Sequence, residues 1–333
     1  YFLFGGISAA FMLFGLSLIY GLSGSTNLGE IATALKGRGL DPLLIVAIVM
    51  TVIGFGFKVA AVPFHLWAPD AYEGAPTPSA AFIASGSKVA SFFIFAKVMM
   101  IGFAGAEGSG AFRYLVSGWV PTIAIVAVLS MGLGNLAAIV QGNVKRLLAY
   151  SAIAHGGYAL LGILANSHQG VAALIYYVIT YGLTTVGAFG VVAVVEQATG
   201  GAKLSDFAGL SRRAPVVSLC MMVFMLSLAG IPPLAGFFGK FYVFLAAAAA
   251  AKNLGLLWLV ILAIAMSAVS LFYYLQVLKR IYISDAPAGA RSIPVSWLTQ
   301  ITLAVLALGV LLLGSFPGWL VALIEHAMPS FGH

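Results

Sequence analysis

The chain has 333 residues, of which 62% are hydrophobic and 8% are charged, against roughly 45–50% and about 25% in ordinary soluble domains. Its 16 Lys and Arg and 9 Asp and Glu residues are too few to cover a water-soluble globule of this size, and the mean hydropathy is +1.08. This composition excludes a soluble enzyme, a nucleic-acid-binding protein and a disordered chain. The net charge of +7 is spread between apolar runs, as in membrane proteins. We therefore expect a membrane protein.

The start of the chain shows no processing signal. The chain begins at Tyr1 inside an apolar run, without an initiating Met, a charged leader or a cleavage site, so it does not read as a signal peptide. We expect it to be a fragment that lacks its own N-terminus.

A single cysteine, Cys220, excludes an internal disulfide and a cysteine metal cluster. No phosphate-binding loop occurs and the histidines are scattered, so we expect no metal and no cofactor in this chain.

The apolar runs predict nine membrane crossings. A helix needs about 20 apolar residues to cross the hydrocarbon core, and a helix satisfies its backbone within one such segment. The predicted crossings are residues 1–21, 42–64, 78–104, 117–139, 146–166, 170–196, 214–251, 255–283 and 295–325. The predicted fold is an all-α, polytopic membrane helix bundle that forms a single domain over residues 1–333.

The basic residues between the crossings predict the orientation, because Lys and Arg are enriched in cytoplasmic loops. Eight of them lie on one side of the membrane: Lys145, Arg146, Lys203, Arg212, Arg213, Lys279, Arg280 and Arg291. The other side collects four: Lys36, Arg38, Arg113 and Lys252. The first side is therefore predicted to face the cytoplasm, which leaves the C-terminus outside.

Prolines interrupt two of the crossings. Segments 42–64 and 214–251 are over-long and contain Pro63 and the pair Pro232 and Pro233. Each segment also combines glycines with a lysine, and paired interrupted helices indicate a transporter core built from inverted repeats.

The missing N–H groups of these prolines release carbonyl groups upstream, namely those of Val59, Leu228 and Ala229. A free carbonyl is tolerated at membrane depth only where protein or water satisfies it. The two helix breaks therefore predict local water.

Three lysines, Lys58, Lys88 and Lys240, lie inside apolar segments, where an ionised lysine costs about 2.5–3.5 kcal/mol on insertion scales. Near a helix end a lysine can extend to the headgroups, and this interpretation stays open for Lys97. Lys58 and Lys240 have an apolar turn on each side and a helix break beside them, which favours a hydrated interior. Such ammonium groups can hold or release a proton as their surroundings change, and we expect proton transfer from all three.

A stripe of polar residues lies on the apolar helices between these lysines. His155, Tyr177, Tyr181 and Thr184 could hold a file of water between Lys88 and Lys240. The alternative is structural, because Tyr and Thr often form hydrogen bonds across packed membrane helices. No carboxylate lies in the middle of a predicted crossing; two, Asp70 and Glu73, are predicted in the loop after Pro63.

The stretch from Phe57 to Pro78, FKVAAVPFHLWAPDAYEGAPTP, resembles the antiporter-like membrane subunits of the proton-pumping NADH:quinone oxidoreductase, respiratory complex I. The form PDAYEGAPTP is similar to the subunit N branch, rather than to its paralogues L and M or to the multisubunit sodium/proton antiporters. Two further motifs support the resemblance, KRLLAYSAIAHGGY at 145–158 and GIPPLAGF at 230–237. The similarity covers essentially the whole chain.

The resemblance implies a fold of fourteen helices with two inverted five-helix repeats and broken helices seven and twelve. The nine crossings then correspond to helices six to fourteen. Residues 1–104 would end the first repeat, 117–283 would form the second, and 295–325 would be the C-terminal helix.

The resemblance also implies a function. Lys58, Lys88 and Lys240 match the family's proton-transferring lysines of helices seven, eight and twelve, and the family pairs the first with a glutamate on helix five, which this chain does not contain. NADH, flavin, iron–sulfur clusters and quinone belong to other subunits, so this chain performs no redox chemistry of its own. The implied partners are a neighbouring antiporter-like subunit, small membrane subunits and lipid.

Two other functions remain open. One is an Mrp-type cation/proton antiporter subunit, which would transport sodium or potassium without NADH oxidation. The other is a structural membrane scaffold, whose buried lysines would tolerate Met or Leu. The Gly- and Ala-rich composition favours a bacterial plasma membrane over an organellar inner membrane.

Overall fold

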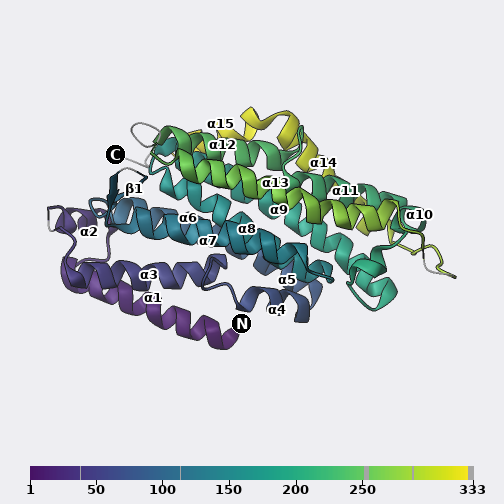
Figure 1. Ribbon diagram of the computed structural model, residues 1–333, viewed down its shortest axis with the longest axis horizontal. Coiled ribbons are helices and arrows are strands. Elements are labelled where there is room, and N and C mark those ends of the chain that lie inside the picture. Colours follow the sequence, from purple (N-terminus) through teal and green to yellow (C-terminus); the bar gives the residue numbers. More distant parts are fainter. Residues whose placement is uncertain (38, 113, 251–254, 287–288, 329–333) are drawn as a thin grey trace.

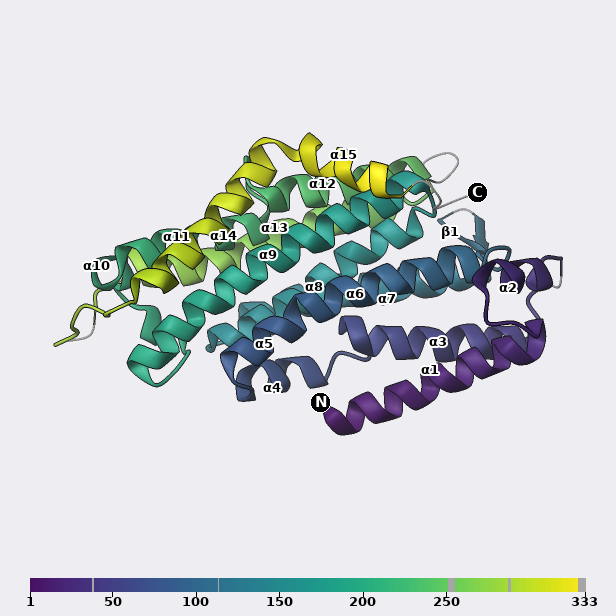
Figure 2. The ribbon, with the colours of Figure 1, turned by 180° about the vertical axis from the view of Figure 1, so that it is seen from behind.

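In the computed structural model the chain forms an elongated bundle of helices that run along its long axis (Figure 1, Figure 2). The structure describes residues 1–37, 39–112, 114–250, 255–286 and 289–328. The elements are α1 (Phe2–Ser23), α2 (Leu28–Leu35), α3 (Pro42–Val59), α4 (Trp67–Gly74), α5 (Thr77–Ala84), α6 (Gly86–Lys97), η1 (Val98–Gly102), β1 (Ser109–Ala111), β2 (Tyr114–Val116), α7 (Trp119–Ile139), α8 (Val144–Leu164), α9 (His168–Thr199), η2 (Leu204–Phe207), α10 (Leu210–Arg213), α11 (Pro215–Ala229), α12 (Ala235–Ala250), α13 (Leu257–Tyr282), α14 (Trp297–Ser315) and α15 (Pro317–Ala327). The predicted all-α membrane bundle is confirmed, with one short antiparallel hairpin, β1–β2, added.

Eight helical segments in the described part of the chain are long and apolar enough to cross a membrane. They are α1, α3, the run from Thr77 to Gly102, α7, α8, α9, α13 and α14. The remaining predicted crossing, 214–251, is divided into α11 and α12, which are both shorter apolar helices. The predicted interruption of this segment is confirmed, because Pro232 and Pro233 cannot continue the backbone ladder of α11.

The first broken helix ends before its proline. Helix α3 stops at Val59, and Ala60 adopts a left-handed conformation with φ 56°. The loop that follows is held by side chains: the hydroxyl of Ser130 accepts from the Val62 N–H at 2.9 Å, and the Trp67 indole donates to the Phe57 carbonyl at 3.1 Å. The two proline-broken helices of the predicted fold are thus both present.

A third proline break was missed. The predicted crossing 295–325 is divided into α14 and α15, and Pro317 is the first residue of α15. Proline deprives the carbonyl four residues earlier, that of Leu313, of its helical donor. The Tyr176 hydroxyl donates to this carbonyl instead, at 2.8 Å. A side chain of the neighbouring helix α9 therefore supplies the hydrogen bond that the broken backbone lacks.

Helix α8 is the centre of the bundle, with 94% of its most apolar window buried, against 17% for α1 at the edge. Figure 1 shows α8 between the layer of α1 and α3 and the layer of α12, α13 and α15. Glycine permits the closest approach: a Cβ on Gly134 of α7 would lie 2.6 Å from the Ala154 nitrogen of α8. Three polar residues of α8, Lys145, Ser151 and His155, are therefore buried within the bundle.

Candidate functional site

Lys240 lies near the start of α12 and is 4% exposed. Its ammonium group donates to the carbonyls of Leu228 at 2.9 Å and Ala229 at 3.0 Å. These are the carbonyls that the two prolines at 232 and 233 release from helix α11. The third donor of Lys240 is satisfied by the Ser267 hydroxyl at 2.8 Å. The lysine therefore caps the broken helix, and all of its partners are uncharged oxygen atoms.

Two further features surround Lys240. Its Nζ lies 5.2 Å from the centroid of the Tyr158 ring, within the range of a cation–π contact. A groove of about 360 Å³ between α12 and α13 is lined by Lys240 and Ser267 together with apolar residues such as Phe241 and Ile264. The ammonium group thus lies at the inner wall of an otherwise apolar groove.

Lys88 is 2% exposed and lies in the first turn of α6. Its Nζ donates to the Ala152 carbonyl of α8 at 2.6 Å and lies 6.0 Å from the Tyr181 ring centroid. The predicted helix 78–104 changes direction at Ser85, between α5 and α6. Lys88 therefore also follows an interruption, although no proline marks it.

His155 of α8 connects three helices and is 4% exposed. Its Nδ1 forms a hydrogen bond with the Tyr177 hydroxyl of α9 at 2.7 Å, and its Nε2 with the Tyr274 hydroxyl of α13 at 3.1 Å. The Tyr274 hydroxyl continues to Ser151 at 2.5 Å, and the ring of Tyr181 lies 4.9 Å from that of His155. The imidazole is therefore the centre of a buried polar network.

Of the predicted relay residues, the structure brings His155, Tyr177 and Tyr181 together. It does not bring Thr184 into this group. The Thr184 hydroxyl donates to the Thr180 carbonyl of its own helix at 2.7 Å and lies 3.4 Å from the Ser227 hydroxyl, next to the break in α11.

Sequence reasoning missed several members of the network. Ser151, Ser267 and Tyr274 contact His155, its partner or Lys240 directly. Asn135 joins two more tyrosines: its amide donates to Tyr158 at 2.9 Å and its carbonyl oxygen accepts from Tyr273 at 3.0 Å. The available signal was the same as for the predicted residues, a polar side chain in an apolar run.

Lys58 stands apart from this network. It lies half-buried in the last turn of α3, and within the described ranges no residue forms a hydrogen bond or ion pair with it. Lys97, for which extension to the headgroups stayed open, is exposed at the end of α6.

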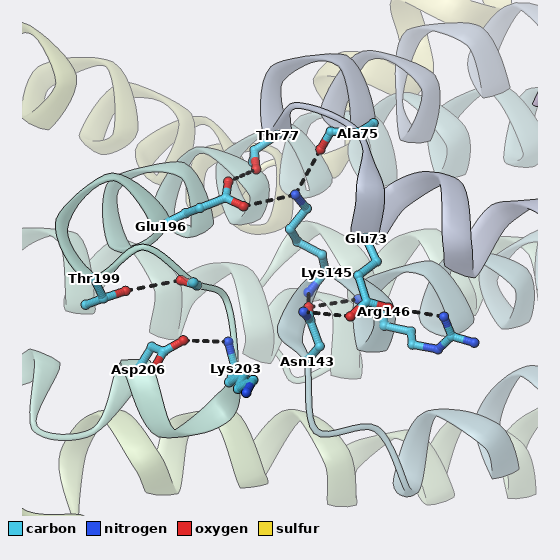
Figure 3. Close-up of polar contacts among 11 residues, drawn as sticks. Glu73, Ala75, Thr77, Asn143, Lys145, Arg146, Glu196, Thr199, Lys203 and Asp206 are labelled. Carbon is cyan, nitrogen blue, oxygen red and sulfur yellow. Dashed lines mark hydrogen bonds and ion pairs between the residues drawn. The ribbon is translucent and has the colours of Figure 1, made fainter.

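A separate ionic cluster lies where the N-terminus of α8 meets α4 and the C-terminal part of α9 (Figure 3). Lys145, 3% exposed, donates to Glu196 at 3.1 Å and to the Ala75 carbonyl at 2.9 Å. The hydroxyl of Thr77 donates to the other oxygen of Glu196.

The second half of the cluster is built on Arg146. It pairs with Asp70 at 2.5 Å and with Glu73 at 3.1 Å, and Asn143 donates to Glu73 at 3.0 Å. Asp70 and Glu73 were predicted in a loop but lie on α4. These pairs join α4, the helix that follows the break after α3, to the start of α8.

No group of three or more His, Cys, Asp or Glu side chains that could hold a metal ion occurs among the residues described. The polar groups of the site are hydroxyls, carbonyls, the Asn135 amide, one imidazole and two ammonium groups. Such a set can exchange protons along hydrogen bonds.

The family model described as "NADH:quinone oxidoreductase/Mrp antiporter, TM" matches residues 1–267. The chain belongs to this family. It is 59% identical over 321 residues to NADH-quinone oxidoreductase subunit N 2 of Acidobacterium capsulatum, covering 96% of this chain and 64% of the relative. It is 43% identical to subunit N of Desulforamulus reducens, covering 99% of this chain and 66% of the relative. The predicted resemblance to the subunit N branch is confirmed.

The chain thus spans just under two thirds of the length of these curated relatives. Among solved structures it resembles a chain of respiratory complex I from Thermus thermophilus, with 36% identity, a TM-score of 0.79, and coverage of 97% of this chain and 67% of that chain. A chain of the Mrp complex from Dietzia has a TM-score of 0.84 over 97% of this chain and 66% of that chain, at 21% identity, and shares the fold.

The family and the apolar helices make the chain a multi-pass membrane protein, as predicted. Its relatives are bacterial, so the membrane is the plasma membrane.

Proposed function

We propose that the chain is a proton-translocating membrane subunit of respiratory complex I. In this function Lys58, Lys88 and Lys240 pass protons along the bundle, while NADH, flavin, iron–sulfur clusters and quinone react in partner subunits. The names of the relatives support the assignment to this enzyme, and the chemistry of the buried lysines supports the mechanism.

The observation that carries the mechanism is the contrast between three equally buried lysines. Lys145 is paired with the carboxylate of Glu196, so losing its proton would leave that carboxylate without its cation. Within the described ranges, Lys88 and Lys240 have only neutral oxygen partners. Deprotonation of Lys88 or Lys240 removes a buried positive charge and leaves no unpaired carboxylate behind. These two ammonium groups are therefore suited to give up and regain a proton.

His155 provides the route between them. Lys88 binds the Ala152 carbonyl, one turn before His155 on α8, and the Tyr158 ring below Lys240 lies 5.7 Å from the His155 ring. An imidazole accepts a proton on one nitrogen and donates from the other. We propose that His155, Tyr177 and Tyr181 relay protons between the two lysines, with Tyr274 as a further member and Thr184 outside the direct path.

Lys58 completes the proposed set. This half-buried lysine has no hydrogen-bond or ion-pair partner among the described residues. We propose that it pairs with a glutamate on a preceding helix of the complete protein. The proposed organisation remains the end of one inverted repeat over 1–104, a second repeat over 117–283, and a C-terminal helix, which the structure divides into α14 and α15.

The decisive experiment replaces Lys88 or Lys240 by Ala in the complete enzyme. Proton pumping and the coupled NADH:quinone reductase activity are measured in membrane vesicles. We expect both to fall strongly in K88A and K240A. The matched control is K97A, which removes an exposed lysine from the same helix as Lys88 and leaves pumping unchanged. A normal proton-to-electron ratio in both buried-lysine variants would refute the mechanism.

The Mrp-type antiporter remains the second candidate, because a solved Mrp chain shares the fold. Purification separates the two functions. Co-isolation with flavin and iron–sulfur subunits supports complex I, and sodium or potassium transport without NADH oxidation supports the antiporter. A structural scaffold predicts instead that Lys88→Met raises stability with normal pumping.

A further inference from the structure

Helix α10, the end of α13 and the segment before α14 lie together at one end of the bundle (Figure 1, Figure 2). They carry five cationic side chains, which we call the basic cluster: Arg212, Arg213, Lys279, Arg280 and Arg291. All are exposed except Arg213, which is half-buried. These residues belong to the side of the membrane that the distribution of Lys and Arg predicts to be cytoplasmic.

Hydrogen bonds hold the three segments of the basic cluster against one another. The Gly209 N–H donates to the Arg280 carbonyl at 3.1 Å, which joins α10 to the end of α13. The Ile293 N–H donates to the Arg213 carbonyl at 3.0 Å. The Arg213 Nε donates to the Arg291 carbonyl at 3.4 Å. The cations are therefore brought to one place by the fold, although they come from separate parts of the sequence.

Little negative charge balances the basic cluster within the described ranges. Asp285 contacts Arg212 at 3.5 Å, but the two side chains are 89% and 76% exposed, and water weakens such a pair. The carboxylate of Asp206 caps its own turn by accepting from a backbone N–H at 2.8 Å. No described carboxylate forms an ion pair with the other four cations, so they are available to an anion from outside the chain.

An exposed apolar stripe runs along α13 up to the basic cluster. Ile264, Ala268, Phe272, Leu275 and Lys279 are all exposed. They follow one another at intervals of three or four residues, so they share one face of the helix. The stripe is about 22 Å long at 1.5 Å per residue, against about 15 Å for the hydrocarbon of one leaflet. It can therefore lie along the full length of an acyl chain.

Two aromatic rings lie beside the basic cluster. Tyr282 is 41% exposed in the last turn of α13, and Trp297 is 72% exposed at the first residue of α14. Exposed Tyr and Trp rings of membrane proteins concentrate at the level of the lipid headgroups. The basic cluster therefore lies at the boundary between membrane and water.

We propose that the basic cluster binds the phosphate of an anionic phospholipid, whose acyl chains lie along the exposed stripe of α13. Lys and Arg form short, charge-assisted hydrogen bonds with phosphate oxygens. Basic sites between helix ends on the cytoplasmic side of a membrane attract acidic headgroups for this reason. One lipid molecule would satisfy both the cations and the apolar stripe.

Other ligands match these features less well. A zwitterionic phospholipid such as phosphatidylcholine would bring its own ammonium group toward the cations. A free phosphate ion would leave the apolar stripe uncovered. The basic cluster contains none of the three lysines of the proposed proton transfer, so this inference does not rest on the proposed function.

The test places the intact complex in vesicles of phosphatidylcholine that contain a small fraction of phosphatidylglycerol with a photoreactive diazirine on one acyl chain. A matched sample carries the same diazirine on phosphatidylcholine. After illumination, peptide mass spectrometry measures the labelling of residues 272–282. We expect phosphatidylglycerol to label this segment several-fold more than phosphatidylcholine at equal concentration. Equal labelling by the two lipids would overturn the proposal.

Variants provide the second measurement. In K279Q/R280Q, labelling by phosphatidylglycerol should fall to the level of phosphatidylcholine, whereas K279R/R280K keeps both charges and should keep the labelling. The matched control is K36Q/K97Q, which removes two exposed lysines at the ends of α2 and α6 and should leave the labelling unchanged. Labelling that K279Q/R280Q does not reduce contradicts the proposal. If this variant fails to assemble, the comparison of the two lipids on the unaltered complex decides the question.

Cross-linking with a carbodiimide tests the competing occupant, an acidic segment of another subunit. If Lys279 becomes joined to a carboxylate of that subunit, and neither lipid labels residues 272–282, the basic cluster is a protein interface and the lipid site is wrong.

Discussion

The ammonium group of Lys240 donates to the Leu228 carbonyl at 2.9 Å, four residues before Pro232. The proline removes the N–H that would have bound this carbonyl in a continuous helix, and the lysine replaces it from the next half-helix. A released carbonyl and a buried ammonium group are each unfavourable in lipid, and here the hydrogen bond between them satisfies both. The same principle recurs at Pro317, where Tyr176 binds the released Leu313 carbonyl.

Ser267→Ala should weaken proton pumping by removing the side-chain acceptor that Lys240 has among the described residues. An ammonium donor left without a partner costs about 1–3 kcal/mol, so the protonated form becomes harder to populate. Pumping in membrane vesicles is expected to fall roughly tenfold, since each 1.4 kcal/mol is tenfold in rate. The control is Ser270→Ala on the same helix, whose hydroxyl donates to the Ser267 carbonyl. Equal pumping in the two variants would remove Ser267 from the mechanism.

Gly230→Ala should impair both folding and pumping. Gly230 has φ +88°, and a Cβ there would lie 3.1 Å from Lys240 Cδ. The left-handed backbone alone costs a residue with a side chain about 1–2 kcal/mol. Gly24→Ala is the matched control, because its φ is +71° and a Cβ there meets no atom within 4 Å.

Thermal unfolding can be followed through reaction of the buried Cys220 with a thiol-reactive dye. Both glycine variants should unfold at lower temperature, but only G230A should lose pumping. Loss of pumping in G24A as well would show that strain, not contact with Lys240, is responsible.

Tyr274→Phe should slow proton transfer through His155. The substitution removes the hydrogen bonds to Ser151 and to His155 Nε2, and a lost bond of about 1–1.5 kcal/mol lowers a rate by roughly tenfold. Tyr176→Phe is the control, since that equally buried hydroxyl binds the Leu313 carbonyl instead. If the Y176F and Y274F enzymes pump equally, His155 does not use Tyr274.

Glu196→Gln should destabilise the fold, because it leaves Lys145 as a buried and unpaired charge. Breaking a buried pair costs about 3–5 kcal/mol; Glu196 is 36% exposed, so we expect about 1–3 kcal/mol. The unfolding temperature of E196Q should therefore fall and should recover in part in the double variant K145M/E196Q.

Asp285→Asn serves as the control for this pair. It breaks the contact between Arg212 and Asp285, whose side chains are 76% and 89% exposed, and exposed pairs contribute little. Its unfolding temperature should not change. A shift as large as that of E196Q would show that burial of Lys145 is not the cause.

The membrane class, the helical fold and the two main helix breaks follow from local sequence. A run of about 20 apolar residues has one stable conformation in lipid, because its backbone must bind within the segment. A proline removes one of those bonds wherever it occurs. Both effects act within a few residues, so the sequence predicts that the carbonyls of Leu228 and Ala229 are released.

The break at Ser85 and the helical position of Asp70 and Glu73 could not be predicted in this way. No proline or glycine run marks Ser85, and the stretch after Pro63 looks like a loop because it is polar. Contacts with α8 hold these segments in place: Glu73 pairs with Arg146, and Lys88 donates to the Ala152 carbonyl.

The sequence by itself placed Lys58, Lys88 and Lys240 inside apolar runs, which have to enter the membrane, and the structure buries Lys88 and Lys240 and leaves Lys58 half-buried. Only the tertiary structure decided what each lysine contacts. Lys145 pairs with a carboxylate, Lys240 donates to the carbonyls of a broken helix, and Lys88 donates to one carbonyl of α8. Those partners come from helices far apart in the chain, and hydrogen bonds between helices depend on packing that no local pattern encodes.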